Sequence, residues 1–263
     1  MRIRTHQART ILALVAGATL LLVSAPGSAG AAASQPPSRP PASLRLAKQA
    51  TSFDRTAKAA ATLAASEIRW ELRNANTAGR PDVVLAYGGV TAVAVVTGDW
   101  DGNGSHTIGV AFARPDGQLG WHLKNTHLPG RPDVVVAYGR ATAAPVTGDW
   151  DGDGTTTIGV AFARSDGQIG WQLRNANTAG PPDITLAYGG VSALAVVTGD
   201  WDGNGSDTPG AVYQRSGELE WQLRDATAPG RPDHVFRYGG LDAGAVVAGD
   251  WDGNRTWTPG IAY

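Results

Sequence analysis

Hydrophobic and polar residues alternate in short stretches over residues 67–263, and residues that favour turns separate these stretches. In QIGWQLR (168–174), Ile169, Trp171 and Leu173 would face one side of an extended chain and the polar residues the other. Three further stretches of the same unit have strand composition: 143–148, 157–163 and 184–189. The pattern therefore predicts four short antiparallel strands in a unit that runs from 143 to 188.

This four-strand unit recurs with a period of about 50 residues. The tryptophans of the third strand show the period, since Trp70, Trp121, Trp171 and Trp221 are separated by 51, 50 and 50 residues. Complete units occupy 93–138, 143–188 and 194–238. Four strands per repeat are typical of a β-propeller blade, and a stack of sheets that does not close is the alternative.

The two ends of the repeat region each contain half a unit. Residues 67–88 hold the third- and fourth-strand stretches, and residues 245–263 hold the first- and second-strand stretches. Half units left open would expose unpaired strand edges, which promote aggregation. The sequence therefore predicts an all-β fold, a four-bladed β-propeller of four-stranded antiparallel blades, in which 67–88 joins 245–263 to complete the fourth blade.

An acidic loop connects the first and second strands of every unit. It reads DWDGNGSH at 99–106 (loop 1), DWDGDGTT at 149–156 (loop 2), DWDGNGSD at 200–207 (loop 3) and DWDGNRTW at 250–257 (loop 4). Oxygen-bearing groups at alternate positions of a tight loop suit a hard cation such as Ca²⁺. The candidate metal ligands are the first, third, fifth and seventh residues of loops 1 to 3, together with the threonine that follows each loop. They are Asp99, Asp101, Asn103, Ser105 and Thr107; Asp149, Asp151, Asp153, Thr155 and Thr157; and Asp200, Asp202, Asn204, Ser206 and Thr208.

The period, the acidic loop and the T-I-G-V or T-P-G segment that follows it resemble the FG-GAP/VCBS-type repeats of integrin α-subunit propellers and of secreted bacterial proteins. The resemblance covers 67–263 and implies a propeller whose acidic loops bind calcium. It departs at the ninth position, where integrin-type loops usually have Asp and this chain has Thr107, Thr157, Thr208 and Thr258. We therefore expect weak binding, with dissociation constants on the order of 10⁻⁴ to 10⁻³ M.

Loop 4 differs from the others because Arg255 stands where they have glycine. Arginine adds a positive charge and does not adopt a left-handed turn as easily as glycine. Asp250, Asp252 and Asn254 are therefore expected to form the weakest site or none. For all four loops the alternative is a metal-free turn, in which Asp and Asn side chains accept hydrogen bonds from their own backbone.

The chain contains nine tryptophans, most of which recur once per unit. The tryptophans of the strands and those that follow the first Asp of each loop are expected to pack between blades, because the indole buries a large apolar area. Trp257 of loop 4 has no counterpart in the other units and is expected to be the most exposed of the nine. It is the candidate residue for stacking against a ligand such as a sugar.

Residues 1–33 have the pattern of a secretory signal peptide, with Arg2, Arg4 and Arg9 before an apolar run at 11–25 and small residues after it. The run is short for a spanning helix, and an N-terminal membrane anchor is the alternative. Residues 34–66 are predicted to form a Pro/Ser linker followed by a short helix at 44–66. After cleavage no membrane span is expected, and the chain has no cysteine for disulfides.

Charge and motifs narrow the function. Removing 1–33 leaves 19 Lys and Arg against 23 Asp and Glu, and no basic stripe predicts nucleic-acid binding. No nucleophile elbow or phosphate-binding loop points to an enzyme, although carboxylates from distant loops leave a secreted hydrolase as a remote alternative. We expect a secreted, monomeric, calcium-stabilised and non-catalytic interaction module that binds an extracellular protein or glycan. A lectin-like carbohydrate-binding propeller is the alternative.

Overall fold

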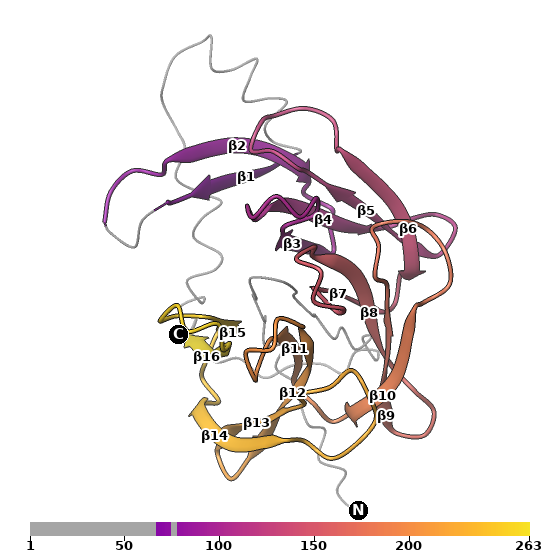
Figure 1. Ribbon diagram of the computed structural model, residues 1–263, viewed down its shortest axis with the longest axis vertical. Coiled ribbons are helices and arrows are strands. Elements are labelled where there is room, and N and C mark those ends of the chain that lie inside the picture. The colour runs from indigo at the N-terminus through magenta and orange to yellow at the C-terminus, as the bar shows by residue number, and fades with distance from the viewer. Residues whose placement is uncertain (1–66, 75–77) are drawn as a thin grey trace, which may run out of the picture.

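The computed structural model describes residues 67–74 and 78–263, and over these residues the protein is all-β (Figure 1). The signal peptide, linker and helix predicted within 1–66 lie outside the described residues. Within the described part of the chain, no helix is long and apolar enough to cross a membrane.

The strands form five antiparallel sheets, and each sheet contains consecutive strands in sequence order. The first four-stranded sheet contains β3 (Ala94–Gly98), β4 (Thr107–Ala113), β5 (Gln118–Leu123) and β6 (Val134–Arg140). The second contains β7 (Ala144–Gly148), β8 (Thr157–Ala163), β9 (Gln168–Leu173) and β10 (Ile184–Gly190). The third contains β11 (Ala195–Gly199), β12 (Thr208–Arg215), β13 (Glu218–Leu223) and β14 (His234–Gly240). Two half-sheets pair β1 (Glu67–Leu72) with β2 (Val83–Gly89), and β15 (Ala245–Gly249) with β16 (Thr258–Ala262). The predicted all-β class, the strands and the three complete units are therefore confirmed.

The alternation of the third strand produces the core of each sheet. Trp121, Trp171 and Trp221 have no exposed surface, and the indole Nε1–H of Trp171 donates to the carbonyl of Tyr188 on the neighbouring strand at 2.9 Å. The same indole-to-carbonyl bond occurs in the other three third strands, including β1, at 2.9 to 3.0 Å. Each of these strand pairs is thus anchored by an indole whose only polar atom is satisfied, and in the three complete sheets this indole is fully buried.

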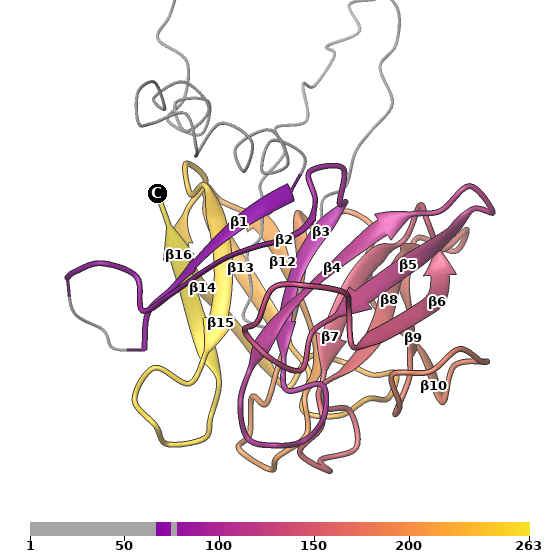
Figure 2. The same cartoon turned by 90° about the horizontal axis from the view of Figure 1, so that it is seen from above.

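The sheets follow one another around a common centre, with β3, β7, β11 and β15 innermost (Figure 1). Each hydrophobic core lies between one sheet and the first two strands of the next. The core of the first sheet, for example, includes Ile158 and Val160 of β8. The acidic loops that leave the inner strands lie on one side of the molecule (Figure 2). The fold therefore brings loops that are about 50 residues apart in sequence to the same side of the centre.

Glycine at the end of each outer strand permits this close packing. Gly139 in β6 has a φ of +80°, and a methyl group built on it would collide with Cγ1 of Val160 in the next sheet. Gly88 has the same relation to Val110. A side chain at either position would both strain the backbone and separate neighbouring sheets.

The half-sheets at the two ends do not pair with each other in this structure. β1 is hydrogen-bonded to β2 and β16 to β15, and no register links β1 to β16. They stand apart in Figure 1, each packed against its neighbour in sequence: β1–β2 against Ile108 and Val110 of β4, and Ile261 of β16 against the core of the third sheet. The predicted joining of 67–88 to 245–263, and with it the closed four-bladed ring, is not seen as a shared sheet and stays a prediction.

Candidate functional site

The carboxylate of the first Asp organises each acidic loop. Asp99 accepts backbone N–H bonds from Asn103 at 3.0 Å and Gly104 at 2.6 Å. Asp149 accepts three such bonds, from Gly152, Asp153 and Gly154, at 2.8 to 3.1 Å. Asp200 and Asp250 are bonded in the same way within their own loops. These are the backbone bonds of the metal-free alternative, so the loops can hold their shape through their own hydrogen bonds.

Loop 2 differs from the others because three carboxylates converge in it. Oxygens of Asp149, Asp151 and Asp153 lie within 4.8 Å of one another. Burial raises the pKa of Asp149, the three backbone N–H groups oppose that rise, and the charge of Asp153 adds to it. Three mutually repelling carboxylates are a donor set that fits Ca²⁺.

Loops 3 and 4 replace the third carboxylate with an amide that interacts with the second. The Nδ2 group of Asn204 donates to Asp202 at 3.0 Å, and that of Asn254 donates to Asp252 at 3.1 Å. In loop 1, Asn103 accepts from the backbone N–H of Ser105 at 2.8 Å. Among the described residues, only loop 2 forms a cluster of three acidic groups.

The threonines at the ninth position are directed into the sheets. The hydroxyls of Thr157 and Thr208 donate to the carbonyl of the glycine that ends the preceding strand, at 3.1 and 3.2 Å. The hydroxyl of Thr107 donates to the carbonyl of Lys124 at 2.5 Å, and all three residues are buried. Two of the candidate ligands at the seventh loop position lie close to the preceding loop: Thr155 lies against Gly102, and Ser206 lies against Gly152. The geometry thus gives these positions a packing role, and the converging ligands are the first three acidic residues of loop 2.

Loop 4 keeps the shape of the other loops but lacks their cover. Arg255 adopts a φ of +73°, close to the +86° of Gly104, at a conformational cost of about 1 kcal/mol. The backbone N–H groups, led by that of Arg255, lower the pKa of Asp250. Trp251 is 60% exposed, whereas Trp100, Trp150 and Trp201 are at most 4% exposed. The expected packing is therefore confirmed for Trp100, Trp150 and Trp201. The expectation that Trp257 would be the most exposed tryptophan is wrong, because no following sheet covers Trp251.

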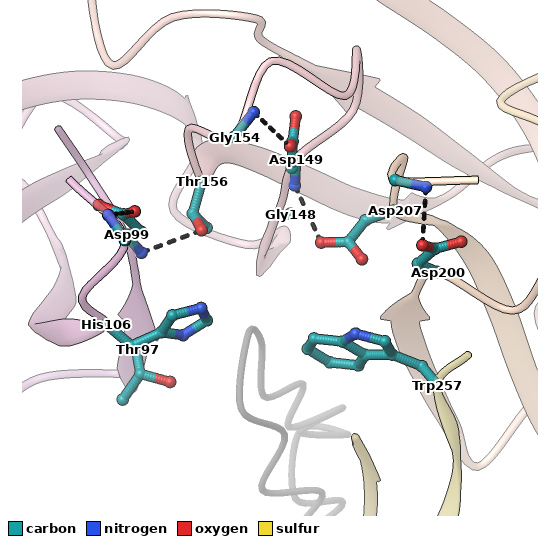
Figure 3. A pocket seen from close by; sticks show the side chains of 12 residues that line it. Thr97, Asp99, His106, Gly148, Asp149, Gly154, Thr156, Asp200, Asp207 and Trp257 are labelled. Carbon is teal, nitrogen blue, oxygen red and sulfur yellow. Dashed lines mark hydrogen bonds between the residues drawn. The ribbon is translucent and has the colours of Figure 1, made fainter. Parts of the chain in front are cut away.

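Residues from all four loops line a cavity of about 230 Å³ at the centre of the sheets, which we call the axial pocket (Figure 3). Its wall includes the first-position residues Asp99, Asp149 and Asp200. It also includes the residue at the eighth position of every loop: His106, Thr156, Asp207 and Trp257. The repeats are nearly identical around this position, yet it carries four different side chains.

In loops 2, 3 and 4, the eighth residue is hydrogen-bonded to the first residue of the preceding loop. The backbone N–H of Thr156 donates to the carbonyl of Asp99 at 2.7 Å, and Asp207 and Trp257 bond in the same way to Asp149 and Asp200. The Thr156 hydroxyl also accepts from the backbone N–H of Asp99 at 3.0 Å. These bonds place the eighth side chains of loops 2, 3 and 4 at the centre, where Trp257 faces His106 of loop 1 across the pocket (Figure 3).

Asp207 is the most perturbed acid of the pocket. Its Oδ2 accepts from the backbone N–H of Asp149 at 2.9 Å. Burial, together with the nearby negative charges of Asp149 and Asp200, raises its pKa from 3.8 to about 7, against the opposing effect of that hydrogen bond. A carboxyl in such surroundings loses its proton at a higher pH than usual, and a cation that enters the pocket would favour the ionised carboxylate.

His106, Thr156 and Asp207 are not among the site residues predicted from the sequence. The signal was present, because the eighth column varies between otherwise repeated loops. It was not read as a site because nothing in one repeat shows that this column points to the centre. Comparisons of the chain with known protein families, curated proteins and solved structures returned no match.

Proposed function

We propose that this protein is a non-catalytic binding module, a four-bladed β-propeller whose ligand site is the axial pocket. The observation that supports this function is the divergence of the eighth loop position. A repeat held only by packing would keep the same residue in every unit, whereas His106, Thr156, Asp207 and Trp257 make one asymmetric wall. Differentiated side chains around a concave polar cavity are what recognition of a small ligand requires.

The register of the complete sheets supports the proposed closure of the ring. In the third sheet, Gly210 pairs with Leu223 and Tyr213 with Glu220. The equivalent residues of the half-sheets are Gly260 opposite Leu72 and Tyr263 opposite Arg69. The first and second sheets have the same register between their second and third strands. The half-sheets β15–β16 and β1–β2 are therefore complementary strand by strand.

The surfaces left open at the two ends also favour closure. Trp70 is partly exposed although its equivalents Trp121, Trp171 and Trp221 are fully buried, and Trp251 is 60% exposed. Three of the four loop-to-loop backbone bonds expected of a ring are formed. Closure would supply the fourth, from the N–H of His106 to the carbonyl of Asp250, and would cover both tryptophans. Burial of apolar area drives this step at roughly 25 cal/mol per Å².

A cysteine pair tests closure without background, because the chain has no cysteine. In the proposed register, Arg69→Cys and Tyr263→Cys are directly opposite, within disulfide reach. Glu71→Cys with Tyr263→Cys is the matched control, displaced by two residues or roughly 6.6 Å along the strand. We expect an intramolecular disulfide in the first pair and not in the second. Equal cross-linking of both pairs, or only disulfide-linked dimers, would refute intrachain closure.

Calcium stabilisation is proposed for loop 2, where Asp149, Asp151 and Asp153 converge. Ca²⁺ at about ten to a hundred times its dissociation constant would stabilise the fold by about 1.4 to 2.7 kcal/mol. The probe is the full chain stripped with EDTA and melted with increasing Ca²⁺. Asp153→Asn should abolish the rise in melting temperature, and Asp202→Asn in loop 3 should leave it unchanged. A rise that Asp153→Asn does not alter would place the ion elsewhere.

Ligand binding itself is tested with a panel of monosaccharides, amines and carboxylates at millimolar concentration, followed by saturation-transfer NMR. Trp257→Thr and Asp207→Thr install the residue that the second repeat has at the same position, so both variants are expected to fold. They should lose binding, whereas Asp202→Asn, which lies outside the pocket wall, should retain it. A panel with no binder, or binding that survives both pocket variants, would refute the proposed site.

A carbohydrate is the second candidate ligand, favoured by the indole of Trp257 on the pocket wall. Aromatic rings provide flat apolar platforms for stacking. Binding of a neutral monosaccharide that depends on Trp257 would establish this alternative. Export from the cell and an extracellular partner remain predictions from residues 1–33, which a secretion assay with and without that segment tests.

A further inference from the structure

We propose that the axial pocket selects a small organic ammonium ion, a protonated amine or a quaternary ammonium group. This inference rests on the proposed function, and it names the ligand class of the same pocket. Carboxyl groups of Asp99, Asp149, Asp200 and Asp207 lie on the wall, and the described residues that line it include no lysine or arginine. A half-enclosed space lined by one sign of charge concentrates ions of the opposite sign.

Asp207 provides the direct ion-pairing group. Asp99, Asp149 and Asp200 direct both carboxylate oxygens to backbone N–H groups of their own loops. Asp207 has one oxygen on the N–H of Asp149, and Figure 3 shows its carboxylate projecting into the pocket. The second oxygen is therefore placed to accept from an ammonium group, while the other carboxylates strengthen the attraction at longer range.

Trp257 provides the second contact that a cation needs. Its indole lies on the pocket wall below Asp207 in Figure 3, and its six-membered ring is fixed against Gly199. The face of an indole attracts a cation through its quadrupole, most strongly where water is partly excluded. A carboxylate and an indole on one small cavity give an ammonium ion two favourable contacts, whereas an anion would be repelled and a neutral sugar would gain only the stacking.

The size of the pocket limits the ligand. A volume of about 230 Å³ lies below the range of about 300 to 1,000 Å³ that is typical of sites for drug-sized molecules. The pocket therefore suits one compact head group, such as a trimethylammonium or a short alkylamine. Thr156 and His106 complete the wall and offer polar atoms to a hydroxyl on the same ligand.

The test compares choline with 3,3-dimethylbutan-1-ol, a neutral molecule of nearly the same shape, by calorimetric titration of the EDTA-treated full chain. We expect choline to bind about tenfold more tightly than the alcohol. Asp207→Thr and Trp257→Thr should each weaken choline binding about tenfold, whereas Asp202→Asn should leave it within about twofold. Melting curves of the three variants, measured alongside, show that the pocket variants are folded.

The outcomes separate this inference from the proposed function. Equal affinity for choline and the alcohol, or a monosaccharide that binds through Trp257 while choline does not, would overturn the ammonium assignment and leave the pocket as a binding site. Absence of any ligand that responds to the pocket variants would overturn both.

Discussion

Replacing Asp207 by asparagine removes the one carboxyl whose environment works most strongly against its charge. The pKa of Asp207 is raised from 3.8 to about 7, so the folded protein holds this proton more tightly than the unfolded chain does. Well below pH 3.8 the carboxyl is protonated in both states and contributes no difference. As pH rises from 4 to 7 the unfolded chain loses the proton first, so stability falls, and above pH 7 the full penalty applies.

The size of this penalty follows from the two pKa values. A rise from 3.8 to about 7 corresponds to roughly 4 kcal/mol of lost stability at pH 8. The wall of the pocket is open to water, which relieves part of this cost, and we expect about 2 kcal/mol. Asp207→Asn keeps an acceptor for the N–H of Asp149 without the charge. At pH 4.5 part of the penalty is already present, because the unfolded carboxyl is then largely ionised, so the stability advantage of the variant over the wild type should be small at pH 4.5 and grow up to pH 8.

Urea unfolding followed by tryptophan fluorescence at pH 4.5, 6 and 8, in EDTA, measures the effect. Asp207→Thr, which copies the residue of the second repeat, should give the same pH dependence without an amide. Asp166→Asn is the control of opposite sign, because Arg164 lowers the pKa of the exposed Asp166. A wild type and an Asp207→Asn variant whose stability curves stay parallel from pH 4.5 to 8 would refute the reasoning.

Three further changes separate local from tertiary contributions. Arg174→Ala removes a largely buried guanidinium that donates to Asp183 at 2.8 Å and to the carbonyl of Pro181. It should lower the free energy of unfolding in urea by about 2 to 3 kcal/mol. Arg114→Ala, whose ion pair is exposed, should not differ measurably from wild type. Gly139→Ala should lower the free energy of unfolding by about 3 kcal/mol, because the added methyl group collides with the next sheet at a left-handed φ. Gly154→Ala, at a similar φ but facing open space, should lower it by about 1 kcal/mol. Equal losses would contradict the packing argument. Asp153→Asn should remove the Ca²⁺-dependent rise in melting temperature, and a titration that is unchanged would contradict the loop 2 site.

Several features of the fold could be predicted from local sequence alone. The alternation in QIGWQLR sets which side chains share a face, and the turn residues between stretches set where strands end, so β9 and its equivalents were predicted to within about a residue. The acidic loops were placed between first and second strands by the repeat. The positions of Trp121, Trp171 and Trp221 in the core follow from the same two-residue period.

The repeat pattern also shows where the units depart from one another, but it does not show which conformation the chain adopts at those places. The half units at 67–88 and 245–263 are complementary in sequence, yet the structure holds them as two separate half-sheets. Likewise, the glycine missing at Arg255 predicts strain, and the backbone accepts the left-handed conformation there all the same. Local patterns give the preference of each segment, whereas the balance between segments depends on how the sheets pack.

The axial pocket was decided by tertiary structure alone. His106, Thr156, Asp207 and Trp257 are about 50 residues apart, and only the packing of successive sheets around one centre brings them together. The raised pKa of Asp207 has the same origin, because removal from water and the approach of Asp149 and Asp200 are effects of neighbours from other repeats. A repeat determines what each unit becomes by itself, and the contacts between units determine what the four eighth-position residues can do together.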